Sequence, residues 1–274
     1  VVTRGMQKLV AGARELGLEI EGGMQERFQI YAELIRSWNR RINLVRLQDE
    51  ENLFCRHFLD SLWCSRGCEL VAVERLLDIG SGAGFPAVPL KICFPHLQVV
   101  MVESQAKRCR FLEEVIDALR LEGCRVIWER SENLARDPNH RETYDCVTAR
   151  ALAALPVVLE LGVPFLKRGG HLLAMKGRRL QEELGQSAFA MSVLGVRLER
   201  IVPYVFEGEE GRHIVSFVKE EPTPEDYPRR AGIPEKRPLL GRGIGGDAVE
   251  KKMQCNARTK GDGVGNDLRR GPQG

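Results

Sequence analysis

Residues 75–91 read RLLDIGSGAGFPAVPLK, and this stretch decides the fold. An apolar run leads into glycines at alternate positions, Gly80, Gly82 and Gly84. Pro86 follows at a point where a helix can begin, because a proline in the first turn forfeits no helical hydrogen bond. A strand, a glycine turn and a helix start in this order let backbone N–H groups approach a nucleotide-like ligand closely. The stretch therefore predicts a strand–turn–helix unit with a ligand-binding turn.

Two kinds of nucleoside site, or a tight turn without a ligand, fit this glycine pattern. Gly82, Gly84 and Ala87 match the G-x-G-x-x-G/A spacing of a dinucleotide-binding turn. Asp78 and the alternate glycines after it match the turn of S-adenosylmethionine-dependent methyltransferases instead. Asp78 favours the second match, because a carboxylate before the glycines would repel a pyrophosphate and could suit a cationic sulfonium amino acid.

Glu103 ends the next predicted strand, 98–103, and lies 23 residues beyond Gly80. An acid at that offset, on the end of the neighbouring parallel strand, can accept hydrogen bonds from both ribose hydroxyls of a bound nucleoside. NAD and S-adenosylmethionine both carry such a ribose, so Glu103 supports a nucleoside site without distinguishing the two. The alternative is an ordinary solvated acid at a strand end.

From Arg75 onward, strand and helix patterns alternate. Strands are predicted at residues 75–80, 98–103, 125–129, 145–149, 170–175, 196–204 and 213–219, and helices at 86–93, 105–121, 131–136, 155–166 and 180–194. This alternation predicts a parallel sheet with helices on both faces. The charged turn 207–212 is too short for a crossover helix, so the last two strands must pair antiparallel. The predicted fold is α/β, with a seven-stranded, mostly parallel sheet and an antiparallel final strand. Class I methyltransferases have this layout, and dehydrogenase Rossmann domains usually lack it.

Four regions are expected along the chain. Apolar residues recur at helical spacing from Phe28 to Ile42, and a second helix is predicted from about Glu50 to Trp63. The expected regions are an N-terminal helical cap (1–70), the sheet domain (71–220), an extended segment rich in proline and charge (221–240) and a disordered tail rich in Gly, Arg and Lys (241–274).

Composition places the chain among globular proteins. Its 274 residues are enough for one α/β core, and 43% hydrophobic with 29% charged content is ordinary. No signal peptide or membrane-spanning stretch is predicted, and the eight cysteines show no zinc-ligand spacing, so we expect a cytoplasmic protein without a metal. The net charge of +3 comes from the last 34 residues. Any argument for a nucleic-acid partner must therefore rest on local basic clusters.

The chain resembles the bacterial rRNA small subunit methyltransferase G family, also called glucose-inhibited division protein B, over roughly residues 28–240. The order and spacing of many short motifs support the resemblance. These motifs are Trp38-Asn39 with Asn43-Leu44, Arg56-His57 with Asp60-Ser61, DIGSGAGFPAVPL, Glu103-Ser104 with Lys107-Arg108 and Phe111-Leu112, Arg150-Ala151, Lys176-Gly177, Arg212-His213, and YPRRAGIPEKRPL.

The resemblance implies a class I methyltransferase, Rossmann-like fold with S-adenosylmethionine as cofactor. It implies methyl transfer to N7 of one guanine in the loop near position 530 of 16S ribosomal RNA, in the small ribosomal subunit. The cofactor positions that it implies are Gly80, Phe85, Ser131, Glu132 and Arg150. The glycine-turn pattern adds Asp78 and Gly82, and the ribose argument adds Glu103.

Guanine N7 carries a lone pair and no proton, so its methylation needs no general base, and we assign no catalytic residue. An RNA substrate does need phosphate or base contacts. Candidates occur as local basic clusters that could equally be solvated surface charges. They are Lys176, Arg178 and Arg179 after the fifth strand, Arg212 and His213 at the last strand, Arg56 on the cap, and Arg229-Arg230. Arg150 closes an apolar strand and must find an anion or a dipole.

Three functions stay open at this point. The first is an RNA guanine-N7 methyltransferase that acts as a monomer on the small subunit, without a membrane. The second is an NAD-dependent oxidoreductase on the same type of fold, and the third is a non-catalytic RNA- or ribosome-binding protein. Binding of S-adenosylmethionine separates the first function from the other two.

Overall fold

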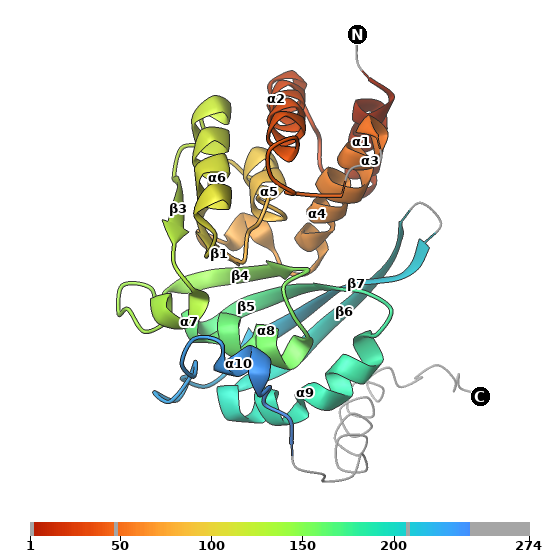
Figure 1. Ribbon diagram of the computed structural model, residues 1–274. Coiled ribbons are helices and arrows are strands. Elements are labelled where there is room, and N and C mark those ends of the chain that lie inside the picture. Colours follow the sequence, from red (N-terminus) through yellow and green to blue (C-terminus); the bar gives the residue numbers. More distant parts are fainter. Residues whose placement is uncertain (1–2, 47–48, 207–208, 242–274) are drawn as a thin grey trace, which may run out of the picture. The chain divides into compact units, whose positions relative to one another are not determined.

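The computed structural model describes residues 3–46, 49–206 and 209–241 (Figure 1). Residues 1–240, which include the regions expected as cap and sheet domain, form one compact unit. The tail expected to be disordered lies outside the described residues from residue 242 onward. The strands are β1 (Arg75–Ile79), β2 (Gln98–Glu103), β3 (Cys124–Trp128), β4 (Tyr144–Arg150), β5 (Leu166–Lys176), β6 (Val196–Phe206) and β7 (Glu209–Lys219).

The seven strands form one sheet in the order β3-β2-β1-β4-β5-β7-β6. β1 to β5 run parallel, whereas β7 is antiparallel to both of its neighbours, β5 and β6. This is the class I methyltransferase arrangement, and it confirms the predicted fold. The strand order reverses at β1, between β2 and β4. Ligands of open α/β sheets bind at the carboxyl ends of the strands next to such a reversal.

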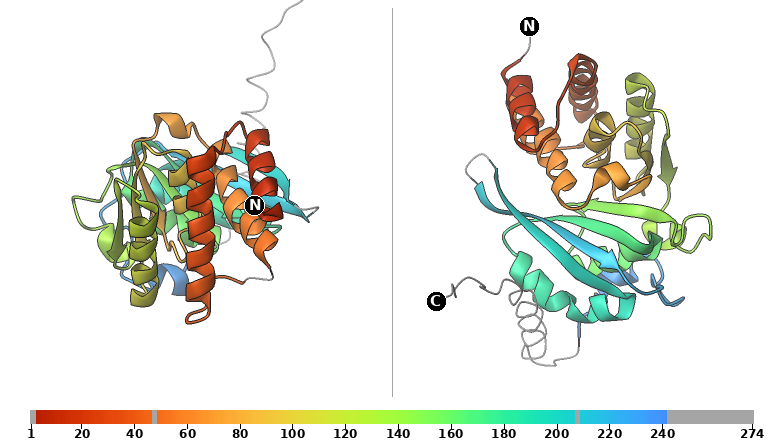
Figure 2. Two further views of the ribbon diagram at one scale, coloured as in Figure 1. Left: turned by 90° about the horizontal axis from the view of Figure 1, so that it is seen from above. Right: turned by 180° about the vertical axis from the view of Figure 1, so that it is seen from behind.

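Helices cover both faces of the sheet (Figures 1 and 2). One face carries α1 (Arg4–Glu15), α2 (Gly22–Asn39), α3 (Glu50–Leu53), α4 (Asp60–Leu62), α5 (Ala87–Cys93) and α6 (Ala106–Leu119). The other carries α7 (Ser131–Leu134), α8 (Leu155–Gly162), α9 (Leu180–Leu194) and α10 (Ile233–Lys236). Within the described ranges, no helix is both long enough and apolar enough to cross a membrane.

Two apolar cores, one on each face, hold the layers together. Leu76 and Met101 belong to the core under the N-terminal helices, whereas Leu77 and Val100 belong to the core under α8 and α9. Consecutive residues of a strand point to opposite faces, so a strand that is apolar at every position fills both cores. This explains why β1 and β2 read as continuous apolar runs.

The helix predicted from Glu50 to Trp63 is interrupted. After α3, residues Phe54–Leu59 form a π-helical turn, and α4 is followed by a 3₁₀ turn, Trp63–Arg66. In the π-helical turn the N–H of Asp60 donates to the carbonyls of Cys55 and His57 and passes over that of Arg56. Arg56 therefore lies in an irregular turn and not in a regular α-helix.

The segment 221–240, predicted to be extended, is instead folded against the sheet domain, and we call it the C-terminal strap. It contains turns and α10, which contacts α8, and it buries Pro234 and Leu239. Proline and charge content does not reveal this packing, because side chains from distant parts of the sequence bind the backbone of this segment.

Candidate functional site

The turn after β1 has the conformation that its glycines suggested. Gly80 and Gly84 have φ angles of +65° and +87°, in the left-handed region. The N–H groups of Gly80 and Ser81 donate to the Val102 carbonyl at 2.9 and 3.1 Å, which ties the turn to β2. A Cβ atom on Gly84 would lie 2.8 Å from the hydroxyl of Tyr31 on α2. The turn is therefore held from two sides and has no room for a side chain at residue 84.

Asp78 lies fully buried at the end of β1, beneath this turn. Its Oδ1 accepts a hydrogen bond of 2.6 Å from the Thr148 hydroxyl, and its Oδ2 has no partner among the described residues. Burial raises the pKa of Asp78 to about 7, although hydrogen bonds from Thr148 and Ser81 oppose the shift. A buried carboxylate with one unpartnered oxygen fits a cationic group, as the sequence argument expected.

Glu103 binds the glycine turn directly. Its side chain is 4% exposed, and its carboxylate accepts hydrogen bonds of 2.9 Å from the N–H groups of Gly82 and Gln105. The sequence argument missed this structural role. The role does not preclude binding of ribose, because each carboxylate oxygen has two lone pairs and only one is used here.

A cavity of about 230 Å³, which we call the first cavity, lies at the carboxyl ends of β1, β2 and β3. Its lining combines apolar side chains with a hydroxyl and carboxylates, and it includes Gly80, Val102, Ser131, Glu132, Leu152 and Pro234. Three of the predicted cofactor residues thus meet in one cavity. The contribution of Leu152 and Pro234 was not foreseen.

The other two residues implied by the family resemblance, Phe85 and Arg150, do not line the first cavity. The Phe85 ring stacks on His57 with centroids 5.1 Å apart, and the Arg150 guanidinium lies 5.4 Å from the Phe85 centroid. The anion that Arg150 requires is Asp60, at 2.9 Å. Arg150 also donates to the carbonyl of Arg56, in the π-helical turn, at 2.8 Å.

Asp60 anchors one wall of a second cavity of about 610 Å³. It is 1% exposed, and besides Arg150 it accepts hydrogen bonds of 2.8 Å from the Tyr204 hydroxyl and from the Arg212 guanidinium. All four residues line this second cavity, together with Arg178. A single buried carboxylate thus orients two arginines toward an open, basic cavity.

Residues 151–153 contribute to both cavities. Ala151 lines the second cavity, and Leu152 and Ala153 line the first. Ala151 has a φ of +50°, and Leu152 lies so close to the turn that a Cβ on Gly80 would be 2.5 Å from its Cδ1. The short segment after β4 is therefore shared by the two cavities.

The structure shows internal partners for Lys176, which also lines the second cavity. Its side chain is 8% exposed, and its ammonium group donates to the Ala153 carbonyl at 2.6 Å and to the Glu183 carboxylate at 2.8 Å. Lys176 thus holds the segment between the cavities, and its contact with RNA stays a prediction.

The other basic candidates differ in exposure. Arg178 and Arg179 are exposed at the carboxyl end of β5, and Arg178 lines the second cavity. Arg212 is paired with Asp60, and Arg56 and His213 are half-buried. Arg178 and Arg179 are therefore the candidates best placed to meet a phosphate.

Arg229 also departs from the sequence interpretation. Its Nε and Nη2 atoms lie 2.8 and 2.6 Å from the two carboxylate oxygens of Glu160, which is fully buried on α8. Arg229 is thus an internal partner and not part of a phosphate-binding cluster. Glu160, which interrupts the apolar segment 151–166, was the sequence signal for this ion pair, because a buried carboxylate requires a cation.

Asp60 and Tyr204 are the site residues that the sequence argument did not identify. Asp60 was noticed only as part of a matched motif, and Tyr204 only as part of a strand. They lie 144 positions apart in the sequence, so no local pattern connects them. Among the described residues, no group of three or more His, Cys, Asp or Glu side chains could hold a metal ion.

Comparisons with known proteins identify the family of the chain. The family model of rRNA small subunit methyltransferase G matches residues 24–215. The Ribosomal RNA small subunit methyltransferase G of Desulfitobacterium hafniense is 46% identical over 228 residues, which are 83% of this chain and 94% of that protein. The proteins of the same name from Staphylococcus carnosus and Roseiflexus castenholzii are 41% and 43% identical, over 86% of this chain and 99% and 100% of their own lengths. The chain therefore belongs to the rRNA small subunit methyltransferase G family and is a methyltransferase.

Proposed function

We propose that the protein transfers a methyl group from S-adenosylmethionine to N7 of a guanine in the 530 loop of 16S ribosomal RNA. Membership of the family supports a ribosomal RNA substrate. The observation that carries the proposal is the pair of adjoining cavities at the carboxyl edge of the sheet. One has the glycine turn of a nucleoside site, and the other is lined by arginines.

The residues of the first cavity and its surroundings fit S-adenosylmethionine. The glycine turn gives close access to backbone N–H groups, and the unpartnered Oδ2 of Asp78 suits a cation. Glu103 would accept the ribose hydroxyls, and Ser131 and Glu132 would hold the adenine. The cofactor, when bound, supplies an electrophilic methyl group. The Phe85 ring, which stacks on His57, would close the part of the cofactor site that holds the methionine group.

The second cavity is suited to an unpaired guanine. An arginine can donate to O6 of guanine or stack on its ring while the N7 lone pair stays available for the methyl group, and Arg178 and Arg212 both line this cavity. Burial, with a contribution from Arg150, lowers the pKa of His57 to about 4, so this imidazole is neutral at pH 7. No proton acceptor is required, because N7 has no proton to lose. The residues act by alignment and exclusion of water.

The proposal is tested by titrating the purified chain with S-adenosylmethionine, with NAD in parallel, in a calorimeter. We expect S-adenosylmethionine to bind and NAD not to bind. Gly80→Asp should abolish binding, since it places a side chain against Leu152 and a charge in the turn. Gly185→Asp is a matched control, because Gly185 is exposed on α9 and the space around a Cβ there is open. Binding of NAD alone, or unchanged affinity of Gly80→Asp, would contradict the assignment.

The guanine is identified in a second step, by incubating the protein and S-adenosylmethionine with deproteinised RNA and with intact small subunits. Cleavage chemistry specific for N7-methylguanosine then locates the product. The two substrates distinguish recognition of the RNA alone from recognition of the assembled subunit.

A further inference from the structure

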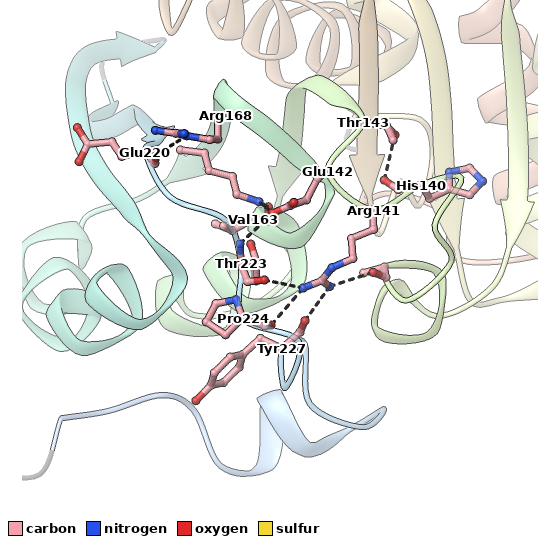
Figure 3. Close-up of polar contacts among 12 residues, drawn as sticks. His140, Arg141, Glu142, Thr143, Val163, Arg168, Glu220, Thr223, Pro224 and Tyr227 are labelled. Carbon is pink, nitrogen blue, oxygen red and sulfur yellow. Dashed lines mark hydrogen bonds and ion pairs between the residues drawn. The ribbon is translucent and has the colours of Figure 1, made fainter.

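The C-terminal strap is attached to the sheet domain along its length. Arg141, before β4, donates to the backbone carbonyls of Thr223, Pro224 and Tyr227 at 2.9, 3.1 and 2.8 Å (Figure 3). Figure 3 shows these three carbonyls converging on one guanidinium group. Such contacts satisfy backbone groups that have no partner in the sheet, and they fix the path of the strap between β7 and α10.

A second attachment lies next to the first cavity. The backbone N–H of Arg229 and its guanidinium both bind the Glu160 carboxylate, and Nη2 of Arg229 also donates to the Arg237 carbonyl at 2.7 Å. Glu160 is fully buried, so it would be a strongly unfavourable charge without Arg229. The pair therefore fixes residues 229–237 as a closed loop on α8.

This loop forms one wall of the first cavity. Pro234 is buried and lines the cavity, and Glu235 lines it at the exposed rim. The N–H of Gly232 donates to Oε1 of Glu132 at 2.8 Å, and Glu132 lines the same cavity. The wall thus depends on a hydrogen bond between Gly232 and Glu132, which are 100 positions apart in the sequence. Gly232 lies in a segment outside the alternating strands and helices.

The expected placement of the cofactor determines what this wall would contact. The glycine turn and Asp78 lie at the end of β1, and Glu103 lies at the end of β2. With the methionine part at β1 and the ribose at β2, the purine extends toward β3, where Ser131, Glu132 and Pro234 line the cavity. Apolar atoms on two sides of a slot suit a flat aromatic ring.

We propose that residues 229–237 of the strap position the cofactor, with Pro234 packing on the purine and the Arg229–Glu160 pair holding Pro234 in place. The inference rests on the proposed function, because it requires S-adenosylmethionine in the first cavity. It predicts that cofactor affinity depends on a segment outside the strands and helices that carry the glycine turn. Pro234 and Arg229 are positioning residues, since neither belongs to the transfer step.

The test is calorimetric titration of the full chain and its variants with S-adenosylmethionine. Pro234→Ala removes two ring methylenes that would cover the purine and should weaken binding about fifteenfold, since each buried methylene contributes about 0.8 kcal/mol. Pro238→Ala is the matched control on the same segment, because Pro238 lines neither cavity, and it should bind like the natural chain.

A double variant, Glu160→Met with Arg229→Met, releases the loop without leaving a buried charge unpaired. We expect it to fold, to bind S-adenosylmethionine about tenfold more weakly, and to raise the KM for the cofactor with little change in kcat. Hydrogen exchange of the natural chain should show protection of residues 229–237 on cofactor binding, and the double variant should lose that protection.

The outcomes separate the two claims. If the natural chain binds S-adenosylmethionine but residues 229–237 gain no protection and Pro234→Ala binds normally, the role of the strap is refuted and the proposed function stands. If Pro238→Ala weakens binding as much as Pro234→Ala, the specific contact is refuted. If the natural chain does not bind S-adenosylmethionine, both claims fail.

Discussion

Replacing Asp60 by asparagine removes the charge on which the second cavity depends. The Asp60 carboxylate accepts hydrogen bonds from Arg150, Arg212 and Tyr204 at 2.8 to 2.9 Å and is almost fully buried. Asparagine retains one acceptor oxygen, but its N–H₂ group would face a guanidinium. The Arg150 side chain, 15% exposed, would then lose its counter-charge.

The size of the effect follows from these contacts. Removing one partner of a buried ion pair costs about 3–5 kcal/mol. Arg150 keeps its hydrogen bonds to the carbonyls of Arg56 and His57 and to the Ser61 hydroxyl, so the lower value applies. For a chain of this size each kcal/mol lowers Tm by about 2–4 °C, so a loss of about 3 kcal/mol lowers it by roughly 6–12 °C.

Thermal unfolding followed by circular dichroism measures this shift. Asp226→Asn, an exposed position on the strap, is the control and should change stability by no more than about 0.5 kcal/mol. A Tm of Asp60→Asn within about 2 °C of the natural chain would refute the view that this carboxylate holds the arginines of the second cavity.

Three further outcomes are expected. Because the pKa of Asp78 is raised to about 7 from 3.8, the folded chain keeps a proton that the unfolded chain has lost at pH values between these two. The contribution of Asp78 to the free energy of unfolding therefore decreases as the pH rises through this range. Asp78→Asn should remove this pH dependence of the free energy of unfolding, measured by urea unfolding at a series of pH values. An unchanged pH dependence would contradict the raised pKa of Asp78. Replacing Arg178 and Arg179 together by alanine should weaken RNA binding and reduce its salt slope by about 1–2, whereas an equal slope would show that neither touches phosphate. Gly84→Ala should lower the free energy of unfolding by about 2 kcal/mol, because a Cβ at residue 84 would meet Tyr31 and alanine would have to adopt a positive φ. Gly177→Ala should lower it by about 0.5 kcal/mol or less, because the space around a Cβ there is open. Equal unfolding free energies of these two variants would contradict that reasoning.

The sheet and its glycine turn could be predicted because their signals are local. Alternating strands and helices, the short turn 207–212 and the spacing from Gly80 to Glu103 each lie within a few tens of residues. The proximity of Gly80, Ser131 and Glu132 follows from strand order alone, since parallel strands bring their carboxyl ends to one edge.

The parts that sequence reasoning missed depend on contacts between distant residues. The Arg56 carbonyl accepts a hydrogen bond from the Arg150 guanidinium, which lies 94 positions away in the sequence. Lys176 carries a charge that suggested phosphate, yet the structure places it against Ala153 and Glu183. Charge in a sequence shows that a partner is needed and does not show whether the partner is internal.

The strap illustrates the same limit. Its proline and charge content is typical of an extended segment, but Arg229 has a buried partner on α8. Glu160 was the visible sign, because it stands alone in an apolar helix. A lone acid among apolar residues predicts that some cation will cover it, without indicating which one.

The proposed specificity is tested by locating the methyl group that the protein adds to small-subunit RNA with S-adenosylmethionine as donor. N7-specific cleavage of the product, with Gly80→Asp as the inactive control, gives the position at single-nucleotide resolution. We expect one modified guanine in the 530 loop of 16S ribosomal RNA, methylated at N7. Methylation at another atom or in another part of the RNA, or no methylation by a chain that binds S-adenosylmethionine, would contradict it.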